Sequence, residues 1–233
     1  METIIIGKEG MSLVKLAAVA RNGAGVRLSK GSENRINASR RLIEKWVAEE
    51  RPVYGVTTGF GALSDVTISR KDTRKLQKNI LMSHSAGVGR ILEPEIVRGI
   101  LALRVQDLAR GNSGIRLETV KRLTELLNRN VCPVIPEQGS VGASGDLAPL
   151  AHLSLVLLGM GEAFYEGERI SGKEALKRAD IAPLELEAAE GLALINGTQV
   201  MTSIGGLAAH DALVLSKTTD IAAAMSLEVL MGS

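Results

Sequence analysis

The spacing of apolar and polar residues predicts a mainly helical chain in which glycine-rich loops separate the helices. In several segments apolar residues recur every three or four positions, which is the spacing of one face of a helix. Ser32 is expected to cap the second of these helices, and Pro94 stands at a first helical position, where its missing N–H costs nothing. The predicted helices span residues 12–21, 33–51, 72–83, 94–111, 117–128, 147–159, 171–179, 186–194 and 196–231. Residues 164–170 alternate in polarity instead, which predicts a small hairpin around Glu166-Gly167.

The last predicted helix differs from the others because apolar residues cover most of its surface. It opens at Asn196-Gly197 and runs to about Met231 without a stop signal. A helix that is apolar nearly all round needs packing partners. The remaining segments offer too few of them, so this helix is expected to pack against a further polypeptide or a second copy of the chain.

Composition describes a globular protein with an aliphatic core. Hydrophobic residues make up 45% and charged residues 23%, the net charge is +2, and aromatic residues are only 2%. The balanced charge and the scarcity of aromatic rings both argue against a nucleic-acid partner. The single cysteine, Cys132, excludes an internal disulfide and fits a cytoplasmic location.

No standard metal or membrane signal is present. The three histidines lie far apart and show no ligand spacing, so no metal is expected. The longest apolar stretch, residues 147–160, contains Pro149 and His152 and is shorter than the roughly 20 residues that a membrane span requires. We therefore expect no membrane partner.

The segment with the most distinctive chemistry is the glycine-rich stretch 139–146. In Ala143-Ser144-Gly145 the Gly145 nitrogen could bond the Ala143 carbonyl carbon, because glycine has no side chain to block the approach. Loss of water, including the Ser144 hydroxyl, would then leave an exocyclic alkene, which is a strong electrophile. The alternative is an ordinary loop in which Asp146 caps the next helix, and spacing alone favours this plainer explanation.

Four ordered motifs resemble those of the aromatic amino acid ammonia-lyases, and most closely those of the histidine type. The first is residues 139–152, GSVGASGDLAPLAH, which resembles the family's signature. The second is the tyrosine loop at 53–61, with Thr57 where the histidine type usually has Asn. The third is Leu76-Gln77-Lys78-Asn79 with Ser83-His84, and the fourth is residues 190–198. The resemblance covers nearly the whole chain, from about residue 4 to 231.

The resemblance implies a cofactor made from the chain itself and two residues that work beside it. Ala143-Ser144-Gly145 would become the 4-methylidene-imidazol-5-one (MIO) group. Tyr54 would be the general base that removes a β-proton, which requires a pKa below the phenol's usual value near 10. Asn196 would hydrogen-bond the MIO ring or the substrate carboxylate. From the residues alone, the favoured role of Tyr54 is that of a core aromatic, and Asn196 could be the N-cap of the last helix.

The resemblance also implies three accessory roles. His84 would contact the substrate side chain, and Gly61 would line the substrate site. Asp146 would assist dehydration of the ring. Considered alone, His84 is better explained as a histidine favoured by the dipole at a helix C-terminus.

By resemblance, the reaction is elimination of ammonia from L-histidine to give trans-urocanate through the MIO electrophile. Tyrosine ammonia-lyase and aromatic 2,3-aminomutase are alternatives within the family, and a non-catalytic assembly partner is an alternative from another class. Family chains are about twice as long, and no position here matches their carboxylate-binding arginine. The expected organisation is an N-terminal MIO-bearing region, residues 1–195, followed by the first long helix of a central bundle, residues 196–233. We expect a homo- or hetero-oligomer completed by a C-terminal half chain, with a small amino acid as substrate.

Overall fold

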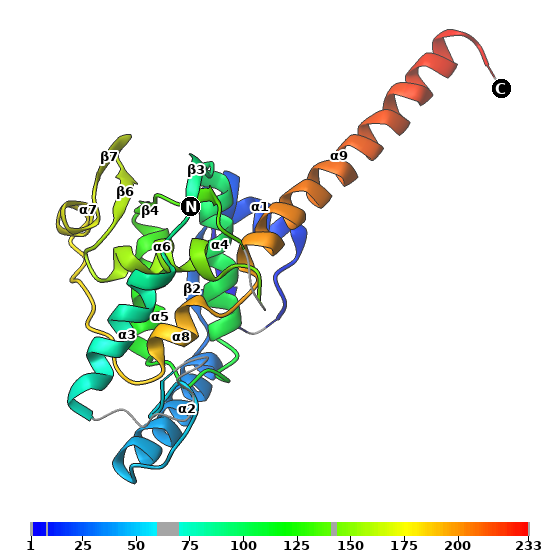
Figure 1. The fold of residues 1–233 in the computed structure, drawn as a ribbon. Coiled ribbons are helices and arrows are strands. Elements are labelled where there is room, and N and C mark those ends of the chain that lie inside the picture. Colours follow the sequence, from blue (N-terminus) through cyan, green and yellow to red (C-terminus); the bar gives the residue numbers. More distant parts are fainter. Residues whose placement is uncertain (1, 8, 60–69, 141–143, 233) are drawn as a thin grey trace.

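The chain folds into a mainly helical body from which one long helix projects (Figure 1). The computed structural model describes residues 2–7, 9–59, 70–140 and 144–232. The helices are α1 (Leu13–Arg21), α2 (Lys30–Ala48), α3 (Arg70–His84), α4 (Pro94–Leu108), α5 (Leu117–Asn128), α6 (Leu147–Leu157), α7 (Gly172–Arg178), α8 (Glu190–Ile195) and α9 (Gln199–Val229). The predicted fold class is confirmed.

Short strand pairs join the helices at three places. The strands are β1 (Thr3–Ile6), β2 (Gly25–Leu28), β3 (Val88–Ile91), β4 (Cys132–Pro133), β5 (Pro136–Gln138), β6 (Glu162–Tyr165) and β7 (Glu168–Ser171). Strands β1 and β2 are parallel, β3 pairs antiparallel with β5, and β4, β6 and β7 form an antiparallel sheet in that order. The β6–β7 hairpin confirms the prediction for residues 164–170. The other strands were missed because segments of two to four residues are too short to show a period.

The core lies where α4, α5 and α6 meet the surrounding elements. Helix α4 contacts α1, α5 and the first turns of α9, while α6 contacts both α3 and α8. The side chains at the centre are aliphatic and fully buried; examples are Ile100, Leu101, Val105, Val120, Leu123, Leu150 and Val156. The short helix α8 is thereby held against α3 and α6, and this arrangement positions the candidate site.

Three predicted helix starts need correction. Helix α2 begins before Ser32, because the extended backbone of Ser29 makes that residue the cap, and its Oγ accepts from the Ser32 N–H at 3.2 Å. Ser32 itself is buried, and its hydroxyl donates to the Gly7 carbonyl. Helix α8 begins at Glu190 rather than 186, since Ala189 has a left-handed φ of 70°. Helix α9 begins at Gln199, with Thr198 rather than Asn196 at its N-cap.

Helix α9 is packed only over its first turns. Gln199, Val200, Ser203 and Leu207 are buried, whereas residues 211–232 are exposed and the helix extends away from the body (Figure 1). Its exposed apolar side chains include Leu213, Val214, Leu215, Ile221, Met225, Leu227, Val229 and Leu230. Within the described ranges, no helix has both the length and the hydropathy needed to cross a membrane.

Candidate active site

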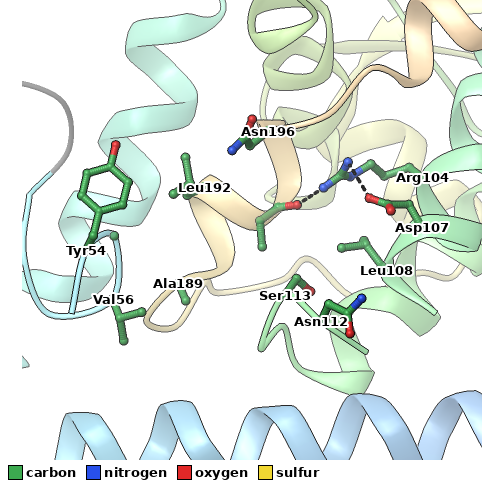
Figure 2. A pocket seen from close by; sticks show the side chains of 12 residues that line it. Tyr54, Val56, Arg104, Asp107, Leu108, Asn112, Ser113, Ala189, Leu192 and Asn196 are labelled. Carbon is green, nitrogen blue, oxygen red and sulfur yellow. Dashed lines mark hydrogen bonds and ion pairs between the residues drawn. The ribbon is translucent and has the colours of Figure 1, made fainter. Parts of the chain in front are cut away.

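A pocket of about 300 Å³ brings together two of the predicted site residues, Tyr54 and Asn196. Tyr54 comes from the loop after α2, and Asn196 stands at the end of α8. Figure 2 shows both side chains on one side of the pocket with Leu192 between them. The complete lining is Tyr54, Gly55, Val56, Arg104, Asp107, Leu108, Asn112, Ser113, Ala189, Leu192, Ala193 and Asn196.

A tight turn over residues 53–57 presents Tyr54 to the pocket. The Val56 and Thr57 N–H groups both donate to the Val53 carbonyl at 3.0 Å. The buried Thr57 side chain closes the turn, since its Oγ1 accepts from the Val53 N–H at 2.9 Å and donates to the Arg51 carbonyl. Gly55 takes a φ of 70°, which glycine adopts without strain. The Tyr54 side chain is 55% exposed, so the structure does not support its alternative role as a core aromatic.

Asn196 is carried by a helix end rather than a helix start. It is the C-cap of α8, and its N–H donates to the Leu192 carbonyl at 2.9 Å. The alternative role predicted for it, as the N-cap of the last helix, is therefore wrong, because Thr198 occupies that position. The Asn196 residue is exposed at the pocket, so its amide is not used to cap α9.

Contacts from other elements anchor α8 and so hold the segment that carries Asn196. The fully buried Glu190 carboxylate accepts from Arg116 Nη2 at 2.7 Å and from Arg116 Nε at 3.0 Å. The fully buried Gln77 on α3 accepts from the Gly191 N–H at 2.7 Å through Oε1. Arg104 on α4 donates to the Ala193 carbonyl (Figure 2).

Residues 144–146, which include two members of the proposed tripeptide, lead into α6 and lie beside the first turn of α9. Ala143 lies outside the described residues. Ser144 Oγ is buried and has no hydrogen-bond partner in the described part of the chain. Gly145 has a left-handed φ of 85°, a conformation that L side chains rarely adopt.

Asp146 caps a different helix from the one expected. It stands at the N-cap position of α6 but makes no side-chain bond to that helix, and its backbone is not extended (φ −110°, ψ 17°). Its buried carboxylate instead accepts from the Val200 N–H at 2.8 Å and the Met201 N–H at 3.1 Å. The predicted cap of α6 is therefore wrong, because tertiary packing directs the side chain to the N-terminus of α9. This contact joins the 144–146 loop to the segment that follows Asn196.

His84 is not among the residues that line the pocket shared by Tyr54 and Asn196. It is the last residue of α3, as its alternative role at a helix C-terminus predicts. Its Nδ1 is 2.8 Å from the Ile80 carbonyl oxygen, so Nδ1 carries the proton and donates. Gly61, the other predicted substrate contact, lies outside the described residues.

Several residues that support the site were given no role from the sequence, although Gln77, Glu190 and His152 stand in the quoted motifs. Arg104, Gln77 and Glu190 are buried polar side chains that hold α8. His152 on α6 accepts from the Gly87 N–H at 3.0 Å and thereby joins α6 to the segment that follows His84. The one available signal was the position of Arg104 inside the apolar run Ile100–Val105, because a charged residue on a core face is rare unless it is paired.

Comparison with known proteins identifies the class to which this fold and loop belong. The family model for aromatic amino acid lyases matches residues 11–233. The chain therefore belongs to the aromatic amino acid lyase family.

Individual relatives are of the histidine type. The chain is 53% identical over 232 residues to a histidine ammonia-lyase of Alkaliphilus oremlandii, all of this chain aligning with 46% of that enzyme. It is 56% identical over 230 residues to the histidine ammonia-lyase of Symbiobacterium thermophilum, covering 99% of this chain and 45% of that enzyme. The chain thus spans about half the length of the curated relatives it matches.

Solved structures show the same fold. The crystal structure of histidine ammonia-lyase from Trypanosoma cruzi matches with a TM-score of 0.91 and 39% identity, over all of this chain and 45% of that one. The phenylalanine aminomutase of Pantoea agglomerans matches with a TM-score of 0.87 and 37% identity, over 94% of this chain and 42% of that one.

Proposed function

We propose that this chain is the MIO-bearing half of a histidine ammonia-lyase. The observation that carries the proposal is identity of 53% and 56% to histidine ammonia-lyases over essentially the whole chain. Identity to the phenylalanine aminomutase is 37%, so elimination of ammonia is favoured over migration of the amino group. The pocket shared by Tyr54 and Asn196 supports the same conclusion, since the two motifs lie far apart in the sequence.

The described residues fit a cofactor made from Ala143-Ser144-Gly145. A buried hydroxyl without a hydrogen-bond partner is costly to keep, and among the described residues Ser144 Oγ has none. It is also the hydroxyl that ring formation would remove as water. Gly145 holds the positive φ that a compressed turn needs. The mature group would supply an electrophile that activates the substrate for loss of ammonia.

The chain's own residues would perform the remaining chemistry. Tyr54 takes the β-proton of L-histidine, the Cα–N bond breaks, the electron pair of the Cβ–H bond forms the new double bond, and ammonia leaves. Asn196 donates a hydrogen bond to the MIO ring or the substrate carboxylate, and His84 contacts the imidazole side chain. Asp146 holds the loop against α9 and assists dehydration of the ring. By resemblance of the 53–61 motif, Gly61 would contribute to the substrate site.

A C-terminal half would complete the site, either as a continuation of this chain or as a separate polypeptide in an oligomer. The apolar, exposed surface of α9 beyond residue 211 supports this, because uncovered apolar patches of that extent are rare in monomers. In this proposal residues 1–195 form the MIO-bearing region and residues 196–233 begin a helical bundle. The proposed location of the protein is the cytoplasm, where its single cysteine would stay reduced.

The test is product formation by the assembled enzyme, meaning this chain together with its C-terminal half. We expect urocanate from L-histidine and much slower formation of a cinnamic acid from tyrosine or phenylalanine. Preferential turnover of tyrosine would show the tyrosine type, and a β-amino acid product would show an aminomutase. Absence of turnover with all three amino acids would favour a non-catalytic assembly partner.

A further inference from the structure

Arg104 is a buried cation whose hydrogen bonds lie on both sides of Asn196. It projects from the C-terminal half of α4 and is only 2% exposed. Its Nη2 donates to the carbonyl of Ala193, in the last turn of α8. Its Nη1 donates to Oε1 of Gln199, the first residue of α9, at 2.7 Å. One guanidinium therefore spans the α8–α9 turn, with Asn196 midway between its two partners.

Gly197 shows how closely the turn approaches this pair. A β-carbon added at position 197 would collide with Arg104 Nη1 and with Gln199 Oε1. The chain can lie against the pair only because residue 197 has no side chain. The residue next to Asn196 is therefore pressed onto the guanidinium, which restricts the backbone that aims the Asn196 amide.

The burial of this charge is expensive, and simple packing would not require it. The carboxylate beside it, Asp107, is 3.3 Å from Nη1 and 46% exposed. Arg104 Nε has no hydrogen-bond partner within the described residues, and burial lowers the pKa of the guanidinium to about 10. An apolar residue of similar volume would fill the space without the desolvation penalty of a buried charge.

We infer that Arg104 is a positioning residue for Asn196, acting with Gln199 as a clamp on the α8–α9 turn. The importance of Asn196 rests on the proposed function, whereas the clamp rests on the contacts alone. The planar guanidinium supplies N–H groups in two directions at once, and a lysine ammonium does not reproduce that fork. Arg104→Lys should therefore fail to restore the clamp even though it keeps the charge.

The experiment is amide hydrogen exchange over residues 193–201, measured by mass spectrometry on the assembled enzyme. Arg104→Lys and Arg104→Met are each expected to speed exchange in this segment by roughly tenfold or more, because both variants lose the two guanidinium hydrogen bonds to the turn. Arg98→Met is the matched control. Arg98 lies on the same helix and donates to the carbonyls of Val19 at 3.0 Å and Leu127 at 3.2 Å, away from α8.

The control variant should leave exchange at 193–201 within about twofold of the wild type. Wild-type protection in Arg104→Lys, or equal loss of protection in Arg98→Met, would overturn the inference. Should Arg104→Met not fold, Gln199→Met decides, because it removes only the second half of the clamp. We expect exchange to rise at least about threefold in that variant, and unchanged exchange would overturn the clamp.

Kinetics then separate positioning from simple loss of stability. Variants of the clamp should lower kcat for histidine while KM stays near the wild-type value. Arg98→Met should leave both kcat and KM near the wild-type values. An assembled wild-type enzyme that leaves histidine unchanged would contradict the proposed function, yet the exchange measurement would still decide whether Arg104 holds the turn. Unaltered kcat in Arg104→Lys would refute the positioning role even if exchange were faster.

Discussion

Replacing Glu190 with glutamine should destabilise the protein far more than its small change in shape suggests. The Glu190 side chain is fully buried, and its two oxygens accept from the Arg116 guanidinium. They also accept from the Arg116 N–H at 3.1 Å, the Thr119 hydroxyl at 2.5 Å and the Glu187 N–H at 2.8 Å. A glutamine side chain offers one acceptor oxygen, so its NH₂ group would face donors.

The size of the loss in the free energy of unfolding depends on how well the Arg116 charge is solvated once its partner is removed. Breaking a buried ion pair by removing one member typically costs about 3–5 kcal/mol. The Arg116 side chain is 22% exposed, so water can solvate part of its charge once the carboxylate is gone. We therefore expect the lower end of that range for Glu190→Gln, about 3 kcal/mol in the free energy of unfolding.

Glu118→Gln is the matched control because it removes a carboxylate from the same arginine at the surface. Glu118 is 57% exposed and lies 3.5 Å from Arg116 Nη1. An exposed pair of this kind contributes about 0–1 kcal/mol. The free energy of unfolding of both variants is measured by urea unfolding, monitored by the circular dichroism signal of the helices. If the two variants cost the same, or if Glu190→Gln costs less than about 1 kcal/mol, the Glu190 network does not anchor α8 as argued.

Three further outcomes are expected. Tyr54→Phe in the assembled enzyme should lower the elimination rate by about 10²–10⁴-fold, the usual effect of losing a general base, with little change in substrate binding; a rate close to wild type would make Tyr54 structural. His84→Leu should shift the ratio of kcat/KM for histidine over phenylalanine toward phenylalanine by roughly tenfold to a hundredfold, since a polar contact to the imidazole is lost; an unchanged ratio would leave His84 as the residue that ends α3. Burial lowers the pKa of His152 below its ordinary value of 6.5. At mildly acidic pH the unfolded chain therefore binds more protons than the folded chain. The stability that neutral His152 contributes is lost as the pH falls below 6.5. His152→Gln should therefore reduce the pH dependence of the free energy of unfolding on the acidic side of 6.5, and identical pH profiles would show that the bond from Gly87 to Nε2 does not depend on a neutral imidazole.

Helix bounds were predictable from the sequence where a helix buries one apolar face in the core. Helix α5 was predicted at the observed bounds, Leu117–Asn128, because its apolar positions follow the helical period on one face and it buries that face in the core. Helix α8 was placed four residues early, since its start depends on the left-handed Ala189 and on the buried Glu190, which no spacing reveals. Ends that are set by distant contacts were therefore the least predictable part of the fold.

The same distinction applies to the candidate site. Tyr54 and Asn196 were expected together from a resemblance, and one pocket holds both. The partner of Asp146 was not predictable, because a carboxylate before a helix can cap that helix or reach another one, and packing decided for α9. Arg104 was missed because its partners are the Ala193 carbonyl of α8 and the Gln199 side chain of α9, and local pattern carries no information about such distant contacts.

The mass of the peptide that carries residues 139–149 tests most directly whether Ala143-Ser144-Gly145 forms the cofactor. We expect this peptide from the assembled enzyme to be lighter than its sequence by the mass of two water molecules. Ser144→Ala should restore the mass of an unmodified peptide and abolish urocanate formation while the helical fold remains. A wild-type peptide of unmodified mass in an enzyme that converts histidine, or near-normal turnover in Ser144→Ala, would contradict the assignment of the cofactor to Ala143-Ser144-Gly145.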